Sequence, residues 1–172
     1  MFNVLTGKRW SVISKEMKDY VCGYYGKAPG NMDKEIVAKV AGDAEILDPK
    51  IAPGTLVVGG TAIPYRDVRG GTTPSSGGGL WLGSDAVDDG SWGYFVGHNP
   101  GSFAPVGSLS SGDAVVVCDR SGAQRAYTVR EVFQVEETAT WKTIASRVTG
   151  YGESVVLQTC AGDGMNVIAV AA

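Results

Sequence analysis

The sequence predicts a mainly β protein, in which a closed barrel with one short inserted helix follows an N-terminal helical hairpin. Two observations support this prediction. Glycine is unevenly distributed, with 5 of the 25 glycines in residues 1–50 and the others in residues 51–172. The second part also alternates short runs of β-forming residues with turn-forming clusters. We therefore expect two segments, a helical hairpin over residues 1–50 and a barrel over residues 51–172.

The first 50 residues carry the spacing of helices. Apolar residues recur there at steps of three and four, which is the period of one helix face. They are Trp10, Ile13, Met17, Val21 and Tyr24. Pro29 and Gly30 predict a turn, Asn31 is a good N-cap for a second helix, and Gly42 ends that helix. An apolar stripe left in water invites association, so this hairpin is also a candidate assembly element.

The predicted strands of the second part are short runs rich in valine and other β-formers. They are residues 57–58, 114–118, 127–135, 155–157 and 167–170. Ser121 and Gly122 lie between two of these runs and predict a hairpin. The stretch 72–79, rich in glycine and serine, is interpreted as a surface loop within the barrel, because the sequence on both sides has the same β-rich character.

One helix interrupts the strands. Trp141, Ile144, Ala145 and Val148 follow the spacing of a helix face, and Thr138 is a candidate cap. Asp113 and Asp119, which flank a strand, are interpreted as solvated turn residues and not as ligands.

Composition limits the function classes. Hydrophobic residues make up 44% and charged residues 19% of the chain, so it can bury a core. A net charge of −3 argues against a nucleic-acid partner bound through a basic surface. No apolar run reaches the length of a membrane span, which predicts a soluble protein. Three cysteines and one histidine fit no disulfide framework and no zinc signature, so we expect neither a metal nor a cofactor.

Cys160 and His98 are the candidate catalytic residues. Cys160 ends an apolar run, and His98 precedes the turn 99–101. Both therefore lie where a strand gives way to a loop, a common location for reactive side chains held by a rigid scaffold. A cysteine nucleophile needs a thiolate, and a neighbouring imidazole stabilises one. On spacing alone, a buried inert cysteine and an unrelated loop histidine remain the alternative.

The segments around these residues resemble the sortases. They occur in the order Val96-Gly97-His98, then Leu109-x-x-Gly112-Asp113-x-Val115, then Tyr127-x-Val129, then Val156-Leu157-Gln158-Thr159-Cys160. The resemblance covers about residues 55–172. It implies the eight-stranded sortase barrel and a cysteine transpeptidase of bacterial surface proteins.

The resemblance also implies roles and partners. Cys160 would attack the carbonyl of a Leu-Pro-type sorting signal to give a thioacyl-enzyme, and His98 would give a proton to the leaving amine. An amine acceptor from the cell wall or a pilin would resolve the intermediate. The implied location is the extracellular face of the bacterial membrane. The residues themselves leave a cytoplasmic location, the sorting motif and the oligomeric state open.

The sequence departs from the sortase pattern at two positions. Val156 replaces the usual threonine, and residues 165–172 contain no arginine, although sortases carry one on the strand after the cysteine. Asn166 is our candidate for the missing oxyanion donor, and an edge-strand residue facing solvent is the alternative. Periodicity does not tell which face of this strand meets the cysteine. The other candidates for the missing group are Arg125, Arg130 and Arg147.

The missing arginine leaves a second function open, which is a catalytically impaired sortase-fold module that binds or scaffolds peptides. Residues 3–47 carry a further resemblance, through Tyr24-Tyr25-Gly26-Lys27-Ala28-Pro29, to the C-terminal helices of the carboxyltransferase domain in biotin-dependent decarboxylases and carboxylases. This segment has neither the metal-binding nor the biotin-carrying residues of that family, so it implies no carboxylase activity. The presence of this segment before the predicted barrel fits either a natural or an artificial fusion. We interpret Cys22 as a packing residue.

Overall fold

The computed structural model of the chain describes residues 51–172. The helical hairpin predicted for residues 1–50 lies outside the described residues, as do Cys22 and the carboxyltransferase-like segment. The hairpin and its assembly role therefore stay predictions.

Eight strands, one α-helix and one 3₁₀ helix make up the described part of the chain. In order they are β1 (Thr55–Val58), β2 (Thr61–Asp67), β3 (Gly78–Gly83), β4 (Trp92–Val96), η2 (Ala104–Ser108), β5 (Ala114–Cys118), β6 (Gln124–Glu136), α3 (Trp141–Val148), β7 (Ser154–Gly162) and β8 (Met165–Ala171).

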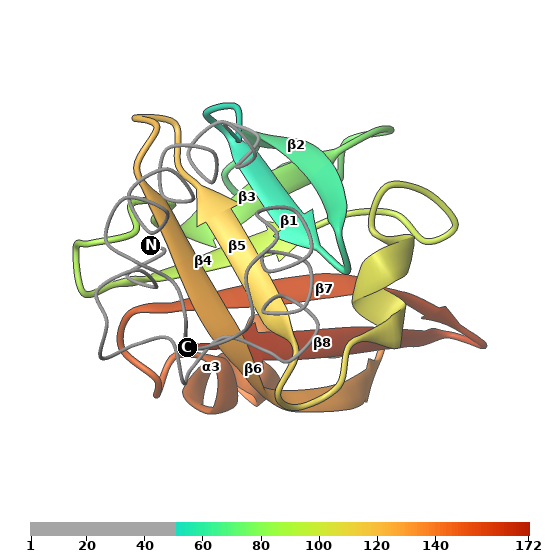
Figure 1. The fold of residues 1–172 in the computed structure, drawn as a ribbon. Coiled ribbons are helices and arrows are strands. Elements are labelled where there is room, and N and C mark those ends of the chain that lie inside the picture. Colours follow the sequence, from blue (N-terminus) through green and yellow to red (C-terminus); the bar gives the residue numbers. More distant parts are fainter. Residues whose placement is uncertain (1–50) are drawn as a thin grey trace, which may run out of the picture. The chain divides into compact units, whose positions relative to one another are not determined.

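The strands close into a barrel in the order β1-β2-β3-β4-β7-β8-β6-β5 (Figure 1). The pairs β2–β3 and β4–β7 are parallel, and the other neighbours are antiparallel. The predicted fold class, a closed barrel with one short inserted helix, is confirmed. Among residues 51–172, no helix is long and apolar enough to cross a membrane.

Strands β2 and β3 are missing from the predicted strands. In β2, alternating polar residues and Pro64 mask the short buried face. The predicted loop 72–79 is too long, because Gly78 and Gly79 are buried and begin β3. A side chain at Gly78 would overlap the ring of Phe103, so glycine here marks a close approach inside the barrel.

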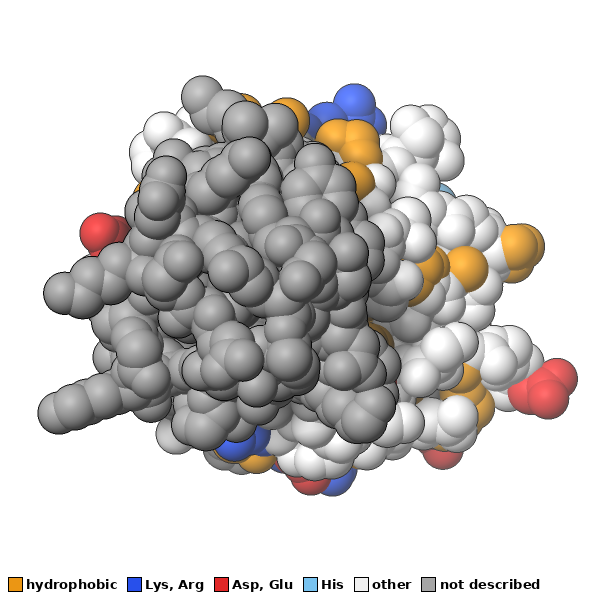
Figure 2. Space-filling model, in the orientation of Figure 1, with side chains coloured by type: hydrophobic (Ala, Val, Ile, Leu, Met, Phe, Trp, Pro, Cys, Tyr) orange, Lys and Arg blue, Asp and Glu red, His pale blue; other side chains and the backbone are white. Residues whose placement is uncertain are grey.

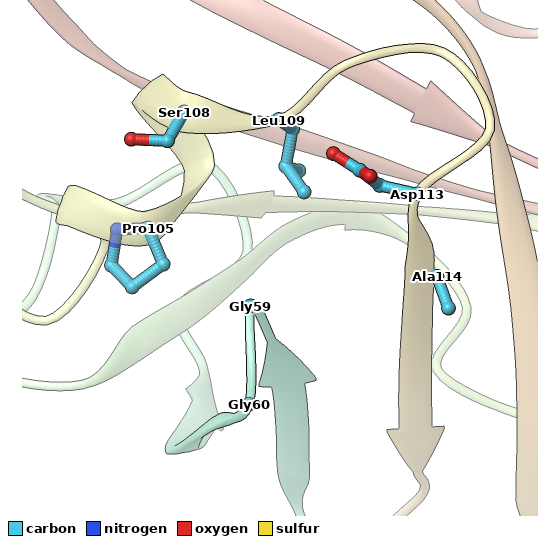
Figure 3. A pocket seen from close by; sticks show the side chains of 7 residues that line it. All are labelled: Gly59, Gly60, Pro105, Ser108, Leu109, Asp113 and Ala114. Atoms are coloured by element: carbon cyan, nitrogen blue, oxygen red, sulfur yellow. The ribbon is translucent and has the colours of Figure 1, made fainter. Parts of the chain in front are cut away.

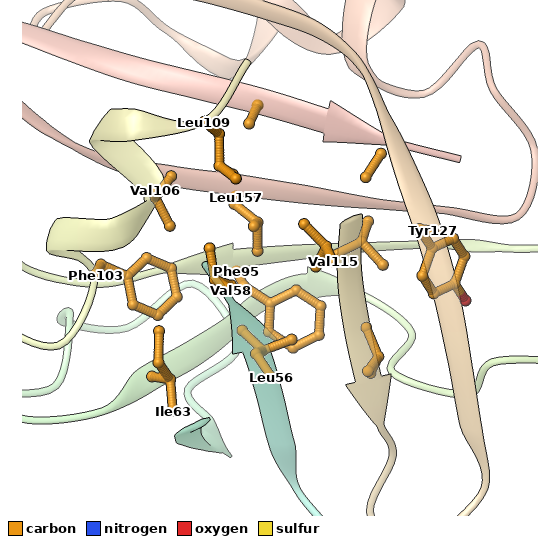
Figure 4. Packing of buried hydrophobic residues seen from close by; sticks show 14 of the residues in the cluster. Leu56, Val58, Ile63, Phe95, Phe103, Val106, Leu109, Val115, Tyr127 and Leu157 are labelled. Atoms are coloured by element: carbon orange, nitrogen blue, oxygen red, sulfur yellow. The ribbon is translucent and has the colours of Figure 1, made fainter. Parts of the chain in front are cut away.

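The barrel has an apolar layer on each side of its wall. The inner layer fills the barrel, and its residues include Leu56, Ile63, Phe95, Phe103, Val115 and Leu157 (Figure 4). The outer layer lies between the sheet and α3, and its buried residues are Tyr94, Val96, Phe133, Ile144, Val148, Val156, Ile168 and Val170. Strands β7 and β8 are therefore buried on both faces over most of their length, which explains their continuous apolar sequences.

The outer layer depends on the predicted helix. Ile144 and Val148 are its buried positions, as the helical spacing predicts. The helix begins two residues later than the candidate cap implied, because its N-cap is Thr140 and Thr138 instead donates to Glu136. On the face drawn in Figure 2, hydrophobic side chains are scattered over the described surface. They give that surface no extended apolar patch.

A polar network joins loops of the barrel. The Tyr65 hydroxyl donates to Asp85 Oδ2 at 2.9 Å, and two guanidinium nitrogens of Arg120 donate to the same carboxylate at 2.8 Å each. These bonds connect β2, the β3–β4 loop and the β5–β6 hairpin. In that hairpin Asp119 accepts hydrogen bonds from Ser121 and Ala123. Asp119 is thus a turn residue as predicted, but the prediction that it is solvated is wrong, because it is buried.

Asp85 gives the barrel a specific sensitivity to acid. Hydrogen bonds from Arg120 and Tyr65 outweigh burial and lower the pKa of Asp85 from 3.8 to about 2. The ionised form is thus favoured in the folded state, and its contribution to stability is present above about pH 4 and lost as the pH falls toward 2. We expect Asp85→Asn to cost about 1–3 kcal/mol at pH 7, measured by urea denaturation, and to flatten the loss of stability between these pH values.

The matched control is Asp88→Asn, because Asp88 is exposed in the same loop. An Asp85→Asn variant whose stability equals that of the Asp88→Asn variant at pH 7 would contradict a stabilising role for the network.

Candidate functional site

Two of the predicted site residues face each other across the β7–β8 hairpin. Cys160 on β7 pairs directly with Asn166 on β8 in the antiparallel register. The turn between them uses Gly162, Asp163 and Gly164, all with positive φ angles. Side chains of directly opposed residues project to the same side of a sheet. The side chain of Asn166 therefore lies on the same face as the thiol, which periodicity alone left undecided.

That shared face is the outer face of the barrel wall. Val156 and Cys160 alternate with Val155 and Leu157 along β7, and Val156 belongs to the outer layer whereas Val155 and Leu157 belong to the inner one. Cys160 thus projects outward beyond the end of the apolar outer layer. Its side chain is partly exposed and its thiol is free.

His98 lies at the same end of the neighbouring strand. β4 and β7 run parallel, and their register pairs end with Val96 opposite Gln158. The pairing continues beyond the end of β4, because the Gly97 amide donates to the Gln158 carbonyl at 3.2 Å and the Thr159 hydroxyl donates to the Gly97 carbonyl at 2.8 Å. His98 follows directly and is exposed. In the described chain, no hydrogen bond joins its imidazole to the thiol of Cys160.

Asn99 is a site residue that the sequence analysis missed. Its side-chain Nδ2 donates to the backbone carbonyl of Cys160 at 3.0 Å. The loop that carries His98 is therefore attached directly to the residue that carries the thiol. In the sequence, only its position could have pointed to Asn99, which follows His98 in a turn that also contains Pro100.

Gly97 and Phe103 hold the histidine loop against the core. Phe103 is fully buried, and its amide donates to the His98 carbonyl at 3.1 Å. A Cβ atom at Gly97 would overlap the Phe103 ring, so only glycine allows the loop to pass this close to the core. Figure 4 shows the Phe103 ring among the inner core side chains.

The carboxamide of Asn166 has no fixed partner. The residue is 8% exposed, and no hydrogen bond joins its side chain to another residue of the described chain. Since no buried polar side-chain atom of the described residues lacks a partner, the unpaired carboxamide reaches solvent and is available as a hydrogen-bond donor to a bound group. Because it is neutral, it brings no positive charge to the thiol.

The three arginines that were considered as substitutes have partners elsewhere. Arg125 donates to the Val87 carbonyl at 3.1 Å, and Arg130 donates to the Ala172 carbonyl at 3.1 Å. Arg147 on α3 forms an ion pair with Glu131, and its guanidinium lies 3.5 Å from the Phe133 ring centroid. Hydrogen bonding to Arg147 lowers the pKa of Glu131. None of these contacts joins an arginine to Cys160, His98 or Asn166.

A separate pocket lies beside the β1–β2 turn. It has a volume of about 410 Å³ and is lined by the seven residues labelled in Figure 3, which come from the β1–β2 turn, η2 and the start of β5. Cys160, His98 and Asn166 do not line it. Its single carboxylate, from Asp113, accepts a hydrogen bond from the Ser110 amide at 2.8 Å, as expected of a turn residue. Within residues 51–172, no group of three or more His, Cys, Asp or Glu residues could hold a metal ion.

Comparison with known proteins identifies the family of this fold. A family model described as the sortase domain matches residues 57–172, more than half of the chain. Listeria monocytogenes sortase A is 19% identical, with a TM-score of 0.54 over 70% of this chain and 86% of that one. Streptococcus pneumoniae sortase C is 14% identical, with a TM-score of 0.53 over 91% and 95%. At these identities the structures show that the fold is shared.

Two curated relatives match over short stretches only. The large subunit of 2-oxoglutarate carboxylase from Hydrogenobacter thermophilus is 50% identical over 42 residues, 24% of this chain and 6% of that protein. A pyruvate carboxylase polypeptide from Methanothermobacter thermautotrophicus is 42% identical over 48 residues, 28% and 8% of the two chains. The chain covers less than a tenth of either relative, so these matches indicate a shared segment only.

The Gly97 contact predicts a strong dependence of stability on one methyl group. Gly97→Ala should lower the free energy of unfolding by about 1–3 kcal/mol in urea denaturation, because the added Cβ overlaps the buried Phe103 ring. Gly107→Ala is the control, since Gly107 is exposed and a Cβ there has 3.6 Å to the nearest atom. Equal stability of the two variants would show that the histidine loop does not depend on this close approach.

Proposed function

The chain belongs to the sortase family, and we propose that it is a cysteine transpeptidase that cleaves a peptide sorting signal and transfers the acyl part to an amine. The observation that carries this proposal is the meeting of Cys160, His98 and Asn166 at one end of β4, β7 and β8. A nucleophile, a proton donor and an oxyanion donor are the groups that acyl transfer through a thioester uses.

The reaction proceeds in two transfers. The Cys160 sulfur attacks the scissile carbonyl carbon, and the amide C–N bond breaks as His98 gives a proton to the leaving amine. The product is a thioester on Cys160. An incoming amine then attacks the thioester carbonyl and loses its proton to His98, and the C–S bond breaks to release the Cys160 thiolate. No oxidant, metal or cofactor enters this sequence of steps.

The backbone contacts support the roles of Cys160 and His98. The hydrogen bonds from Thr159 to Gly97 and from Asn99 to Cys160 join the loop that carries His98 to β7, which carries Cys160. Preorganisation of this kind reduces the entropy that must be lost before reaction. The exposure of both side chains lets a peptide and an amine approach them.

Asn166 is proposed as the oxyanion donor. Its place opposite Cys160 in the register and its unpaired carboxamide support this role. A neutral donor stabilises the developing negative charge less than a charge-assisted one, so the account predicts a slower enzyme than a sortase with arginine at this place.

The proposed partners follow from the family. The peptide is a sorting signal of a surface protein, and the amine acceptor comes from the cell wall or a pilin. The Streptococcus pneumoniae relative is described with pilin substrate specificity, and a Clostridium perfringens sortase C was solved with a C-terminal cell wall sorting motif. The corresponding location is the outer face of the bacterial membrane.

A second candidate function is a sortase-fold module that binds peptides without cleaving them. The observation that favours it is the set of arginine contacts, since Arg125, Arg130 and Arg147 are all held away from the thiol by other partners. The two candidates differ in whether a covalent intermediate forms on Cys160.

Thiol labelling tests the nucleophile. We expect an alkylating probe on the folded protein to modify Cys160 well before Cys118, because the Cys118 thiol is buried and donates to the Ile51 carbonyl at 3.3 Å. Cys160→Ala should abolish cleavage of a fluorescence-quenched Leu-Pro peptide, and Cys118→Ala, the control, should retain it. Equal labelling of both thiols together with cleavage by the Cys160→Ala variant would refute the proposed function.

Substitution of Asn166 should affect peptide turnover but not thiol labelling at position 160, whereas substitution of Cys160 should abolish both. Asn166→Ala should lower kcat by about 10²–10³, because the oxyanion forms only once the carbonyl is attacked. Labelling of Cys160 should change little, because the free thiol does not depend on an oxyanion donor. Met165→Ala, next to Asn166 on the same strand, is the control. If Asn166→Ala turns over the peptide as fast as the parent protein, Asn166 is not the donor.

A further inference from the structure

Gln158 is a polar residue in the apolar outer layer next to the thiol. It precedes Cys160 by two positions on β7, so both side chains project from the same face. Its register partners are Val96 on β4 and Ile168 on β8, both of them buried residues of the outer layer. Gln158 itself is partly exposed. A partly exposed carboxamide thus lies between two buried apolar residues, on the face of the barrel wall that also carries Cys160.

Tyr94 fixes the orientation of that carboxamide. The Tyr94 hydroxyl donates to Gln158 Oε1 at 2.5 Å. Tyr94 is fully buried, and its ring lies against Trp141 at 5.8 Å and Trp81 at 5.7 Å between centroids. Burial raises the pKa of Tyr94, so the hydroxyl keeps its proton and remains a donor. A donating hydroxyl requires an acceptor, which is the oxygen end of the Gln158 side chain.

The nitrogen end is therefore left to face outward. Within residues 51–172 no hydrogen bond uses Gln158 Nε2, and a carboxamide nitrogen carries two donors. The buried Tyr94 fixes the rotation of this carboxamide. A ligand that accepts its hydrogen bond therefore causes little further loss of side-chain entropy. This is the arrangement of a recognition group, since apolar pockets use a few fixed polar groups for orientation and specificity.

We propose that Gln158 is a specificity-determining residue that donates a hydrogen bond to a carbonyl of the peptide segment entering the Cys160 site, and that Tyr94 is its positioning residue. The inference rests on the proposed function and names what that site recognises. The peptide class is one that places a carbonyl acceptor against the partly exposed Gln158 carboxamide as the segment enters the Cys160 site. The donor acts in binding and not in bond breaking.

Steady-state kinetics with a fluorescence-quenched Leu-Pro peptide test this role. Gln158→Met keeps the length of the side chain but removes both donors, and it should raise KM about tenfold with little change in kcat, which is the size of one hydrogen bond. Cys160 labelling should also be unchanged. Gln134→Met is the matched control, because Gln134 is exposed on β6 and should keep the parent KM.

Tyr94→Phe separates positioning from direct contact. It should raise KM by a smaller factor than Gln158→Met, because the carboxamide remains but can rotate. In the Gln158→Met background it should have no further effect on KM, since there is nothing left to orient. Additive effects of the two substitutions would show that Tyr94 acts through packing alone and would overturn its positioning role.

The outcomes separate this inference from the proposed function. A parent protein that cleaves the peptide, together with a Gln158→Met variant of unchanged KM, would overturn the inference and leave the transpeptidase intact. A fall in kcat at constant KM would overturn it as well, because the residue would then act in the chemical step. A parent protein that neither cleaves nor binds any peptide of a Leu-Pro panel would refute the proposed function itself, and the inference with it.

Discussion

The parallel pairing of β4 with β7 is the constraint on which the site depends. His98 and Cys160 are 62 residues apart in the sequence, and the parallel register brings them to the same edge of the barrel wall. Five successive register pairs, from Trp92 with Ser154 to Val96 with Gln158, fix their relative position. A slip of one residue would turn Cys160 into the barrel, so the proposed chemistry depends on the register of this pair.

Two apolar layers enforce that register. Val155 and Leu157 point into the barrel, while Val156 packs beneath α3 in the outer layer with Tyr94. A shift of the register by one residue would move the inner residues of β7 to the outer layer and the outer residues to the inner layer. Thr159 is the last residue of β7 before Cys160 that points inward. Its hydroxyl is buried, and it is hydrogen-bonded because it donates to the Gly97 carbonyl. Core packing and site geometry are thus maintained by the same strand.

The sequence predicts most of the barrel because its longest strands are rich in β-forming residues and its helix is strongly periodic. The burial of β8 on both faces hides which face carries Asn166, and only the pairing with Cys160 decides it. Strand β2 escapes prediction because Pro64 lies within it. The role of Asn99 also lies beyond sequence reasoning, since its hydrogen bond to the Cys160 carbonyl depends on a contact across 61 positions.

A sortase barrel with asparagine in place of arginine on β8 raises one central question, which is whether the thiol of Cys160 still becomes acylated. Intact-mass spectrometry of the protein incubated with a Leu-Pro peptide, in the absence of an amine acceptor, answers it directly. The account predicts a mass increase equal to the acyl part of the peptide, located on Cys160 and removed by hydroxylamine, a reagent that cleaves thioesters. Peptide bound at the site without any covalent adduct on Cys160 would contradict it.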